Sequence, residues 1–297
     1  NKFHNARLVL QDGSIYQGTS FGYQGSVAGE VVFNTAMTGY PENLTDPSYK
    51  GQILISTYPL VGNYGVPGSA LKNGILAHYE SSQVQVSGFI IQEYSFDHSH
   101  WNAAVSLDEW LKQHKVPGIY GLDTRALTKK LREHGSLLGK IISEGNDVAF
   151  YDPNVDNLVA QVSIDRVETY GNGKYKILLV DCGVKNNIIR CLLERDTTVI
   201  RVPWNHDLSQ LEFDGIFLSN GPGDPQICSE LIRNIQPFFE KDIPVFGICL
   251  GSQIMGLAAG ANTYKLKYGH RGHNQPVQEV NSHNCFITTQ NHGYVVD

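Results

Sequence analysis

The sequence SNGPGDPQICSELIRNIQPFFEKDIPVFGICLGSQ, residues 219–253, contains two glycine-rich turns separated by one helical and one strand-like segment. Apolar residues at helical spacing predict a helix over Ile227–Phe239, and a second helix is predicted over Asn186–Glu194. Four short apolar runs predict buried strands: Lys176–Val180, Thr198–Val202, Gly215–Leu218 and Val245–Ile248. This alternation predicts a mostly parallel, doubly wound α/β sheet with helices on both faces.

The second of the two turns, Gly247-Ile248-Cys249-Leu250-Gly251, lies where a strand gives way to a helix that starts near Ser252. Two glycines around a central residue are typical of a nucleophile elbow, here with cysteine in place of serine. We expect the helix N-terminus to favour a Cys249 thiolate and the amide of Leu250 to donate to an oxyanion. Alone, the pattern is equally compatible with a packed cysteine between two turn glycines.

The first turn, Ser219–Pro225, follows the predicted strand Gly215–Leu218. Its glycines expose backbone amides at a strand end, and Pro225 is a favoured first residue of a helix. Ligands of parallel sheets bind at the carboxyl ends of the strands, so Gly221 becomes a candidate second oxyanion donor. The alternative is a plain strand-to-helix turn.

The first half of the chain has a different sequence pattern, with strands, turns and short helices. This pattern predicts a mixed α+β domain. Strands are predicted at Ala6–Leu10, Ser14–Gln17, Gly29–Asn34 and Gln52–Thr57, the first two joined by a hairpin turn at Asp12-Gly13. A capping box at Ser106–Glu109 starts one helix, and Asp123 caps another that runs through Leu131 to Gly135. The polar segment 152–173 is predicted to be an irregular linker between a domain at 1–151 and a domain at 174–297.

Composition restricts the function classes. A net charge of -6 argues against a nucleic-acid surface, because no basic patch is available to neutralise phosphates. The longest apolar runs are too short to span a bilayer, so no membrane partner is expected. Five cysteines without a Cys-x-x-Cys pair indicate neither a zinc site nor a disulfide framework, and no metal is expected. A reducing, cytoplasmic location is the simpler interpretation.

Several strings together carry a family resemblance. NGPGDP (220–225) and PVFGICLGSQ (244–253) resemble the class I glutamine amidotransferases. KYGHRGHNQP (267–276) and QNHGY (290–294) resemble the small subunit, or glutaminase domain, of carbamoyl-phosphate synthase. The stretch 29–65 resembles the N-terminal domain of that family, which other class I amidotransferases lack. The resemblance covers nearly the whole chain and is nearest to the fused eukaryotic pyrimidine-pathway proteins.

The resemblance implies a role for individual residues. Cys249 is the nucleophile that forms a thioester with the glutamine side chain, and the amides of Gly221 and Leu250 are the oxyanion donors. Glutamine is held by residues at eight matching positions: Ser48, Gly221, Gly223, Leu250, Gln253, Asn291, Gly293 and Tyr294. Ser48 belongs to the first half, so the implied site lies at the domain interface. ATP and Mg²⁺ are implied only for the synthetase partner, and no cofactor is expected in this chain.

The sequence departs from the family pattern at the general base. The family uses a histidine followed two residues later by a glutamate, and no such string follows Cys249. His292 matches a position near the substrate loop, not the base. We therefore expect residues 1–297 to be a C-terminally incomplete piece of a longer polypeptide, whose catalytic histidine and glutamate follow Asp297.

Three functions remain open at this point. The first is a glutaminase that supplies ammonia to a synthetase, either a separate large subunit or a fused domain. The second is a non-catalytic regulatory or assembly module that keeps the amidotransferase fold, against which the retained Cys249 and Gln253 argue. The third is an amidotransferase for another acceptor, which the family-specific first half disfavours. The sequence does not distinguish pyrimidine from arginine synthesis, and it does not identify allosteric effectors or the oligomeric state.

Overall fold

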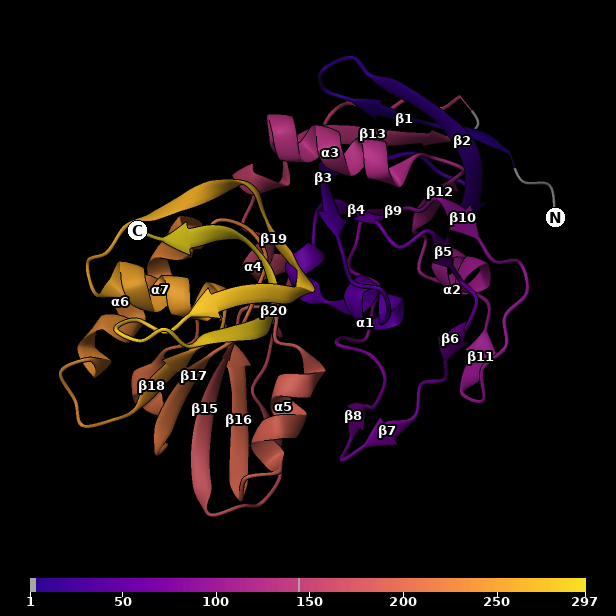
Figure 1. The fold of residues 1–297 in the computed structure, drawn as a ribbon. Coiled ribbons are helices and arrows are strands. Elements are labelled where there is room, and N and C mark those ends of the chain that lie inside the picture. The colour runs from indigo at the N-terminus through magenta and orange to yellow at the C-terminus, as the bar shows by residue number, and fades with distance from the viewer. Residues whose placement is uncertain (1–3, 144) are drawn as a thin grey trace.

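A computed structural model of the chain describes residues 4–143 and 145–297 and places two differently built halves side by side (Figure 1). Residues 1–3 of the predicted first domain lie outside the described residues. The first half is built on a closed seven-stranded barrel. In hydrogen-bonded order its strands are β1 (Asn5–Leu10), β13 (Leu137–Ser143), β3 (Val27–Asn34), β4 (Gln52–Ser56), β9 (Gly88–Ile90), β12 (Pro117–Tyr120) and β2 (Ile15–Gly22).

The barrel closes through an antiparallel pairing of β1 with β13, in which Leu8 lies opposite Ile141. Leu8, Ile53, Ile90 and Ile141 are fully buried in one apolar cluster. The four strands predicted for the first half are confirmed, but barrel closure was not predicted. The alternation of apolar and polar residues along a strand shows which face is buried. It does not show which strand, more than a hundred residues away, will pair with it.

Short elements surround the barrel. They are α1 (Tyr40–Thr45), η1 (Pro47–Tyr49), α2 (Leu107–Gln113), α3 (Thr124–His134), β5 (Leu60–Val61), β6 (Val66–Pro67), β7 (Leu71–Lys72), β8 (Ile75–Leu76), β10 (Glu93–Tyr94) and β11 (Ala103–Val105). Both predicted helix starts are confirmed, because the Ser106 side chain accepts a hydrogen bond from the amide of Glu109 and Asp123 accepts one from the amide of Ala126. Gly135 ends α3 with a φ of 97°.

The second half contains a five-stranded sheet. Its order is β14 (Glu168–Tyr170), β16 (Thr197–Pro203), β15 (Tyr175–Asp181), β17 (Gly215–Leu218) and β18 (Val245–Gly247). The helices are α5 (Asn186–Leu193), α6 (Ser229–Ile235) and α7 (Leu250–Ala258), with 3-10 turns η3 (Leu208–Gln210), η4 (Pro225–Cys228) and η5 (Gln236–Phe238). Leu178 and Val180 pack toward α6 and α7, whereas Leu179 faces the side of α5. The doubly wound parallel arrangement of β15 to β18 is confirmed.

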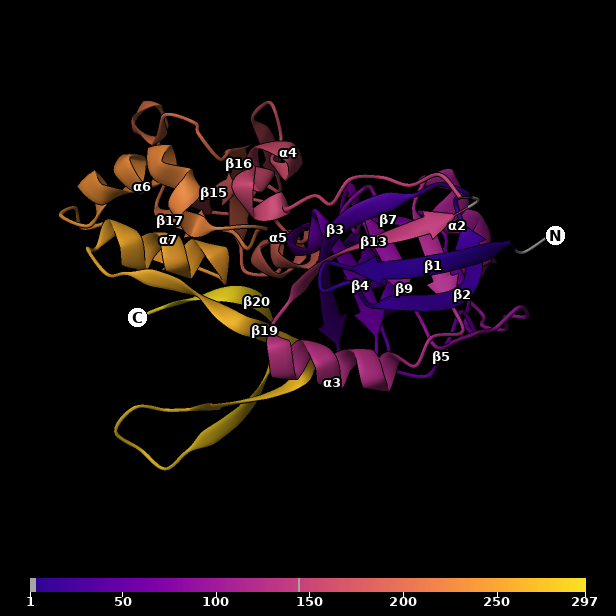
Figure 2. The same cartoon turned by 90° about the horizontal axis from the view of Figure 1, so that it is seen from above.

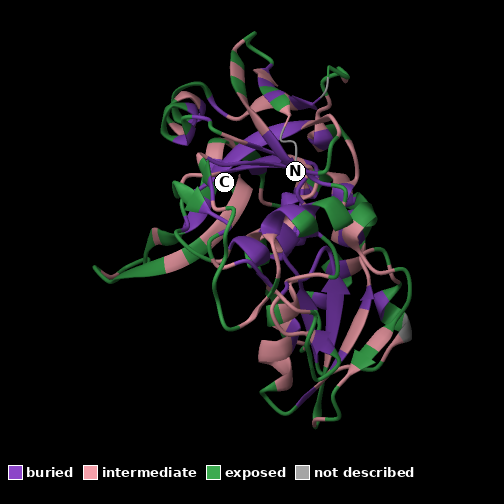
Figure 3. Cartoon of the chain, turned by 90° about the vertical axis from the view of Figure 1, so that its right-hand side faces the viewer, coloured by how far each residue is buried: buried purple, intermediate pink, exposed green. Residues whose placement is uncertain are grey.

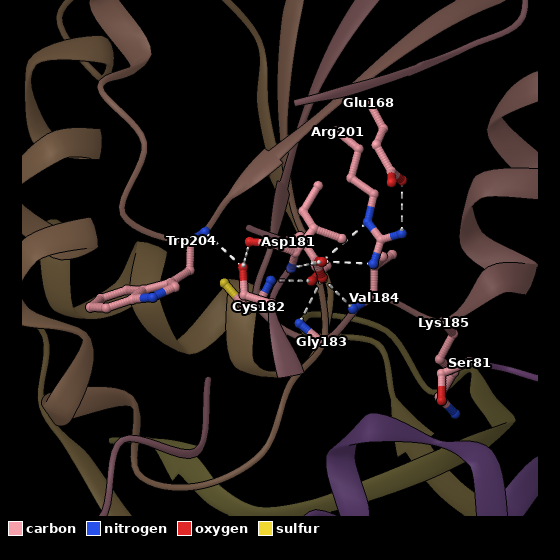
Figure 4. Close-up of polar contacts among 12 residues, drawn as sticks. Ser81, Glu168, Asp181, Cys182, Gly183, Val184, Lys185, Arg201 and Trp204 are labelled. Atoms are coloured by element: carbon pink, nitrogen blue, oxygen red, sulfur yellow. Dashed lines mark hydrogen bonds and ion pairs between the residues drawn. The ribbon is translucent and has the colours of Figure 1, made fainter. Parts of the chain in front are cut away.

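The predicted linker is more ordered than expected. It contains η2 (Pro153–Val155), α4 (Leu158–Val162) and β14, which pairs antiparallel with β16 as the edge of the second sheet. Figure 4 shows the fully buried Asp181 at the centre of the contacts that hold this region. Asp181 accepts hydrogen bonds from the amides of Ile164, Gly183 and Val184 and from the Arg201 guanidinium. The prediction of an irregular segment was wrong because these partners are distant in sequence.

A long antiparallel hairpin, β19 (Thr263–Gln278) and β20 (Cys285–Val296), completes the described chain. Its outer end extends away from both halves (Figure 2), and Val280 and Ile287 there are 83% and 70% exposed. Its inner end lies between the barrel and α7. Colouring by burial shows the same contrast, with buried strands inside each half and exposed positions along the hairpin (Figure 3).

Candidate active site

The turn between β18 and α7 has the strained geometry of an elbow. Cys249 is partly exposed and adopts φ 53° and ψ -112°, a conformation that non-glycine residues rarely occupy. A β-carbon at Gly251 would lie 2.2 Å from the carbonyl oxygen of Leu218, and one at Gly247 would lie 2.5 Å from the backbone of Gly251. The two glycines therefore let the strand and the helix approach closely while the cysteine is held at the sharp turn, as predicted.

The thiol itself is not ionised in this arrangement. Burial, together with the nearby carboxylate of Asp46, raises the pKa of Cys249 to about 11. A hydrogen bond from the Leu250 amide and the positive charge of Lys185 act in the opposite direction but do not overcome burial. The amide donor expected at this helix N-terminus is present and lowers the pKa of Cys249, but loss of water around the sulfur outweighs it. The Cys249 thiol instead donates to the carbonyl oxygen of Asn291, with sulfur and oxygen 3.4 Å apart.

This pKa predicts slow alkylation. In a polypeptide of residues 1–297, Cys249 should react with iodoacetamide at pH 7.5 about ten- to a hundredfold more slowly than free cysteine, because the thiolate is the reacting species. The rate should rise about tenfold per pH unit from pH 7 to pH 10. Peptide mass spectrometry separates Cys249 from the exposed Cys285, which serves as an internal standard. A Cys249 rate that levels off near pH 7 would contradict this prediction.

The Ser219–Pro225 turn brings a second backbone segment to the elbow. A β-carbon at Gly221 would lie 2.1 Å from the carbonyl oxygen of Cys182 and 2.8 Å from the Leu250 side chain, so no other residue fits without movement. Asn220 fixes the turn, because its amide donates to the Ser48 hydroxyl at 3.0 Å and to the carbonyl of Gly183 at 2.9 Å. The turn is thereby tied to the barrel half as well as to the elbow.

One pocket collects the predicted residues from both halves. Apart from Leu250, which lies beside it as the first residue of α7, all of them line this pocket: Ser48, Gly221, Gly223, Cys249, Gln253, Asn291, Gly293 and Tyr294. Gln253, on the first turns of α7, donates to the carbonyl oxygen of Tyr294 at 2.6 Å. The arrangement places a thiol, a hydroxyl, two carboxamides and several backbone groups around one small space.

The pocket also contains three charged residues and a glutamine that the sequence analysis did not identify. Glu30 and Gln52 come from the barrel, and Lys265 and Arg271 come from β19. Behind them, Asp46 forms an ion pair of 2.9 Å with Lys185 and accepts a hydrogen bond of 2.9 Å from Asn291. Asp46 stands two residues before Ser48, within the stretch 29–65 that carries the family resemblance, and this position was the available signal. Glu30, Gln52, Lys265 and Arg271 carry no local signal, and the contact between Glu30 and Lys265 joins the two halves.

Comparison with known proteins agrees with this geometry. Residues 8–141 match the family model described as carbamoyl-phosphate synthase small chain, CPSase domain, and residues 178–297 match glutamine amidotransferase class-I. The carbamoyl phosphate synthase small chain of Pyrococcus furiosus is 48% identical, and the match covers 97% of this chain and 81% of that protein. This chain belongs to the carbamoyl-phosphate synthase small-chain family.

Other relatives of this small-chain family member are much longer. The human "Carbamoyl-phosphate synthase [ammonia], mitochondrial" is 50% identical over all of this chain, which covers 20% of that protein. The "Multifunctional protein CAD" of Squalus acanthias is also 50% identical, with 98% of this chain and 13% of that protein covered. The chain thus spans about a fifth or less of the length of these relatives.

His292 is the histidine that lines the pocket of this small-chain family member, and its ring is engaged on both sides. Nδ1 lies 2.9 Å from the carbonyl oxygen of Tyr294, and Nε2 lies 2.9 Å from Oε1 of Gln290. Burial lowers the pKa of His292, which favours the neutral ring, and a neutral ring can donate to only one of these two oxygens. Both ring nitrogens thus lie 2.9 Å from oxygens of Tyr294 and Gln290, and the ring forms part of the pocket wall.

Two structural properties bear on ligands of this small-chain family member. Over residues 4–143 and 145–297, no group of three or more histidine, cysteine, aspartate or glutamate side chains is arranged to hold a metal ion. In the same part of the chain, no helix is long and apolar enough to cross a membrane. All five cysteines, which lie within the described residues, are free thiols.

Proposed function

We propose that this chain is the glutamine-hydrolysing component of a glutamine-dependent carbamoyl-phosphate synthase. One observation carries the proposal: a cysteine in an elbow faces a pocket that also holds the residues implied for glutamine binding, drawn from both halves of the chain. Domain interfaces are common sites for small ligands. The same residues from one half alone would form an open surface.

In the proposed reaction, the sulfur of Cys249 attacks the side-chain amide carbon of glutamine. A carbon–sulfur bond forms, the carbonyl oxygen becomes an oxyanion near the amides of Gly221 and Leu250, and the carbon–nitrogen bond then breaks. The thiol proton leaves with the nitrogen as ammonia. Water hydrolyses the resulting thioester to glutamate and restores the thiol. Proton transfer is proposed to use a histidine and a glutamate, as the family resemblance implies, and neither role is assigned to a residue of this sequence.

The partner is proposed to be a carbamoyl-phosphate synthetase, as a large subunit or a fused domain. The ammonia passes to this partner, and ATP and Mg²⁺ are used there. This chain then needs L-glutamine but no cofactor, nucleic acid or membrane. The five free thiols support a reducing compartment, and we propose the cytoplasm.

The test is made on the complete polypeptide together with its synthetase. Glutamate release and carbamoyl phosphate formation are measured with glutamine and, separately, with ammonium chloride as the nitrogen source. We expect both sources to support synthesis, with one glutamate released for each carbamoyl phosphate made from glutamine. Synthesis from ammonia without any glutamate release would overturn the proposed glutaminase.

A non-catalytic module is the second candidate. The raised pKa of Cys249 and a human relative that carries ammonia in its name favour it. The retained elbow, with Gln253 bonded to the strand behind it, favours the glutaminase. Only the non-catalytic module predicts that glutamine has no effect on carbamoyl phosphate synthesis at any concentration.

A further inference from the structure

The barrel contacts β19 at a position directly opposite a predicted glutamine-binding residue. Glu30, on barrel strand β3, is 4% exposed, and its Oε1 lies 2.5 Å from Nζ of Lys265. Lys265 is paired across the β19–β20 hairpin with Tyr294. A residue of the first half therefore fixes the strand that lies beside Tyr294, although Glu30 and Lys265 are 235 positions apart.

A second contact repeats this arrangement. The amide of Thr35, just after β3, donates to the carbonyl oxygen of Arg271 at 3.3 Å, and Arg271 is paired with Asn291 across the hairpin. A β-carbon at Gly272 would lie 2.4 Å from the Thr35 hydroxyl, so the barrel and β19 touch closely here. The two contacts thus stand opposite Asn291 and Tyr294, the first and last of the three predicted binding residues on β20.

Those two residues present carbonyl groups to the reactive elbow. The Asn291 carbonyl accepts the Cys249 thiol, and the Tyr294 carbonyl accepts the Gln253 side chain. Hydrogen bonds between paired strands make β19 and β20 move together, so a shift of β19 displaces both carbonyls. Such a shift would move the Asn291–Tyr294 segment out of the geometry in which it is proposed to hold glutamine.

The groups around Glu30 favour the charged form of its carboxylate. Gln52 donates to its Oε2 and Ser136 donates to its Oε1, each at 2.9 Å. Burial alone would raise the pKa of Glu30, but Lys265 and Arg271 beside it hold that pKa below its ordinary value. Among the residues that the structure describes, Nε of Arg271 has no hydrogen-bond partner, and Arg271 is 6% exposed. Loss of the carboxylate charge would leave two cations facing each other across the pocket wall.

We propose that Glu30 is a positioning residue for glutamine, which acts through Lys265 to hold the Asn291–Tyr294 segment in its binding geometry. This inference rests on the proposed glutaminase function. It assigns to the barrel half a direct part in setting the glutamine affinity of the site. Glu30 itself need not touch the substrate.

The test uses Glu30→Gln, Lys265→Met and the double variant in the complete polypeptide with its synthetase. We expect Glu30→Gln to raise the KM for glutamine about tenfold while kcat and ammonia-dependent synthesis change less than about twofold. Lys265→Met should have a similar effect, and the double variant should be no worse than either single variant. Asp12→Asn is the matched control, because it removes a 2.6 Å carboxylate–lysine contact of the barrel that lies outside the pocket.

Two results would overturn the inference. Additive increases in KM in the double variant would mean that Glu30 contacts glutamine directly instead of acting through Lys265. Equal losses of glutamine-dependent and ammonia-dependent synthesis, with a lower Tm, would mean a general role in folding. Amide hydrogen exchange across residues 290–295 gives a readout without glutamine: it should rise in Glu30→Gln and not in Asp12→Asn. If the wild-type protein does not hydrolyse glutamine, the proposed function fails, and hydrogen exchange still decides whether Glu30 holds this segment.

Discussion

Replacing Cys249 by serine is expected to lower glutamine-dependent carbamoyl phosphate synthesis by at least about a thousandfold, because a serine hydroxyl in this elbow is a far weaker nucleophile than a thiol. Synthesis from ammonium chloride reports on the synthetase partner and should stay within about twofold of wild type. Both rates are measured on the complete polypeptide with its partner, under identical conditions. Serine fits the same strained turn, so a loss of folding is not expected.

Cys285→Ser is the matched control for this experiment. Cys285 is an exposed thiol at the start of β20, outside the pocket, and its replacement should leave both activities unchanged. If Cys249→Ser retains glutamine-dependent synthesis, the sulfur does not form the proposed thioester. Equal loss with glutamine and with ammonia would instead point to damage of the contact with the synthetase.

The second large effect is expected for Gly251→Ala. The added β-carbon would lie 2.2 Å from the carbonyl oxygen and 2.6 Å from the carbonyl carbon of Leu218, so the strand and helix must separate. We expect the free energy of unfolding to fall by about 3 kcal/mol, from which the better helix propensity of alanine recovers at most about 1 kcal/mol. Urea denaturation followed by circular dichroism measures the change, and glutamine hydrolysis should be lost with it.

Gly256→Ala, in the same helix, provides the comparison. Its β-carbon would lie 3.1 and 3.2 Å from the two methyl groups of Val296, contacts that a small side-chain shift relieves. The free energy of unfolding should therefore change by less than about 1 kcal/mol. Similar losses for the two substitutions would show that strand–helix approach at Gly251 is not what restricts that position.

The elbow and the turn before it could be predicted from sequence because their geometry is local. A side chain at Gly247 would meet the backbone of Gly251 and Ser252 in the same turn. At Gly221 and Gly251 the glycine itself was the signal, although the atoms it packs against belong to Cys182 and Leu218 at the ends of neighbouring strands. Helix caps at Ser106 and Asp123 were predictable for the same reason. The parallel sheet followed from the order of apolar runs, which restricts the possible connections.

Features that depend on distant partners were not predictable. Closure of the barrel joins β1 to β13, and Glu30 meets Lys265 from the other half. The pKa of Cys249 depends on how much of the chain surrounds the sulfur, and a motif read along the sequence shows only the helix amides beside it. Roles carried over by family resemblance for Ser48, Gly223, Gln253 and Gly293 remain predictions, although these residues share one pocket.

Closure of the barrel by β13 also orders events in time during synthesis on the ribosome. The last barrel strand ends at Ser143, whereas β20 begins only at Cys285. N-terminal domains fold first as a chain emerges, so the barrel can bury its core long before the final hairpin exists. The side of the barrel that carries Glu30 and Ser48 is then already folded when β19 and β20 pack against it. The reactive cysteine would be translated before β19 and β20, and the pocket around it would gain the residues of these two strands only after both had emerged.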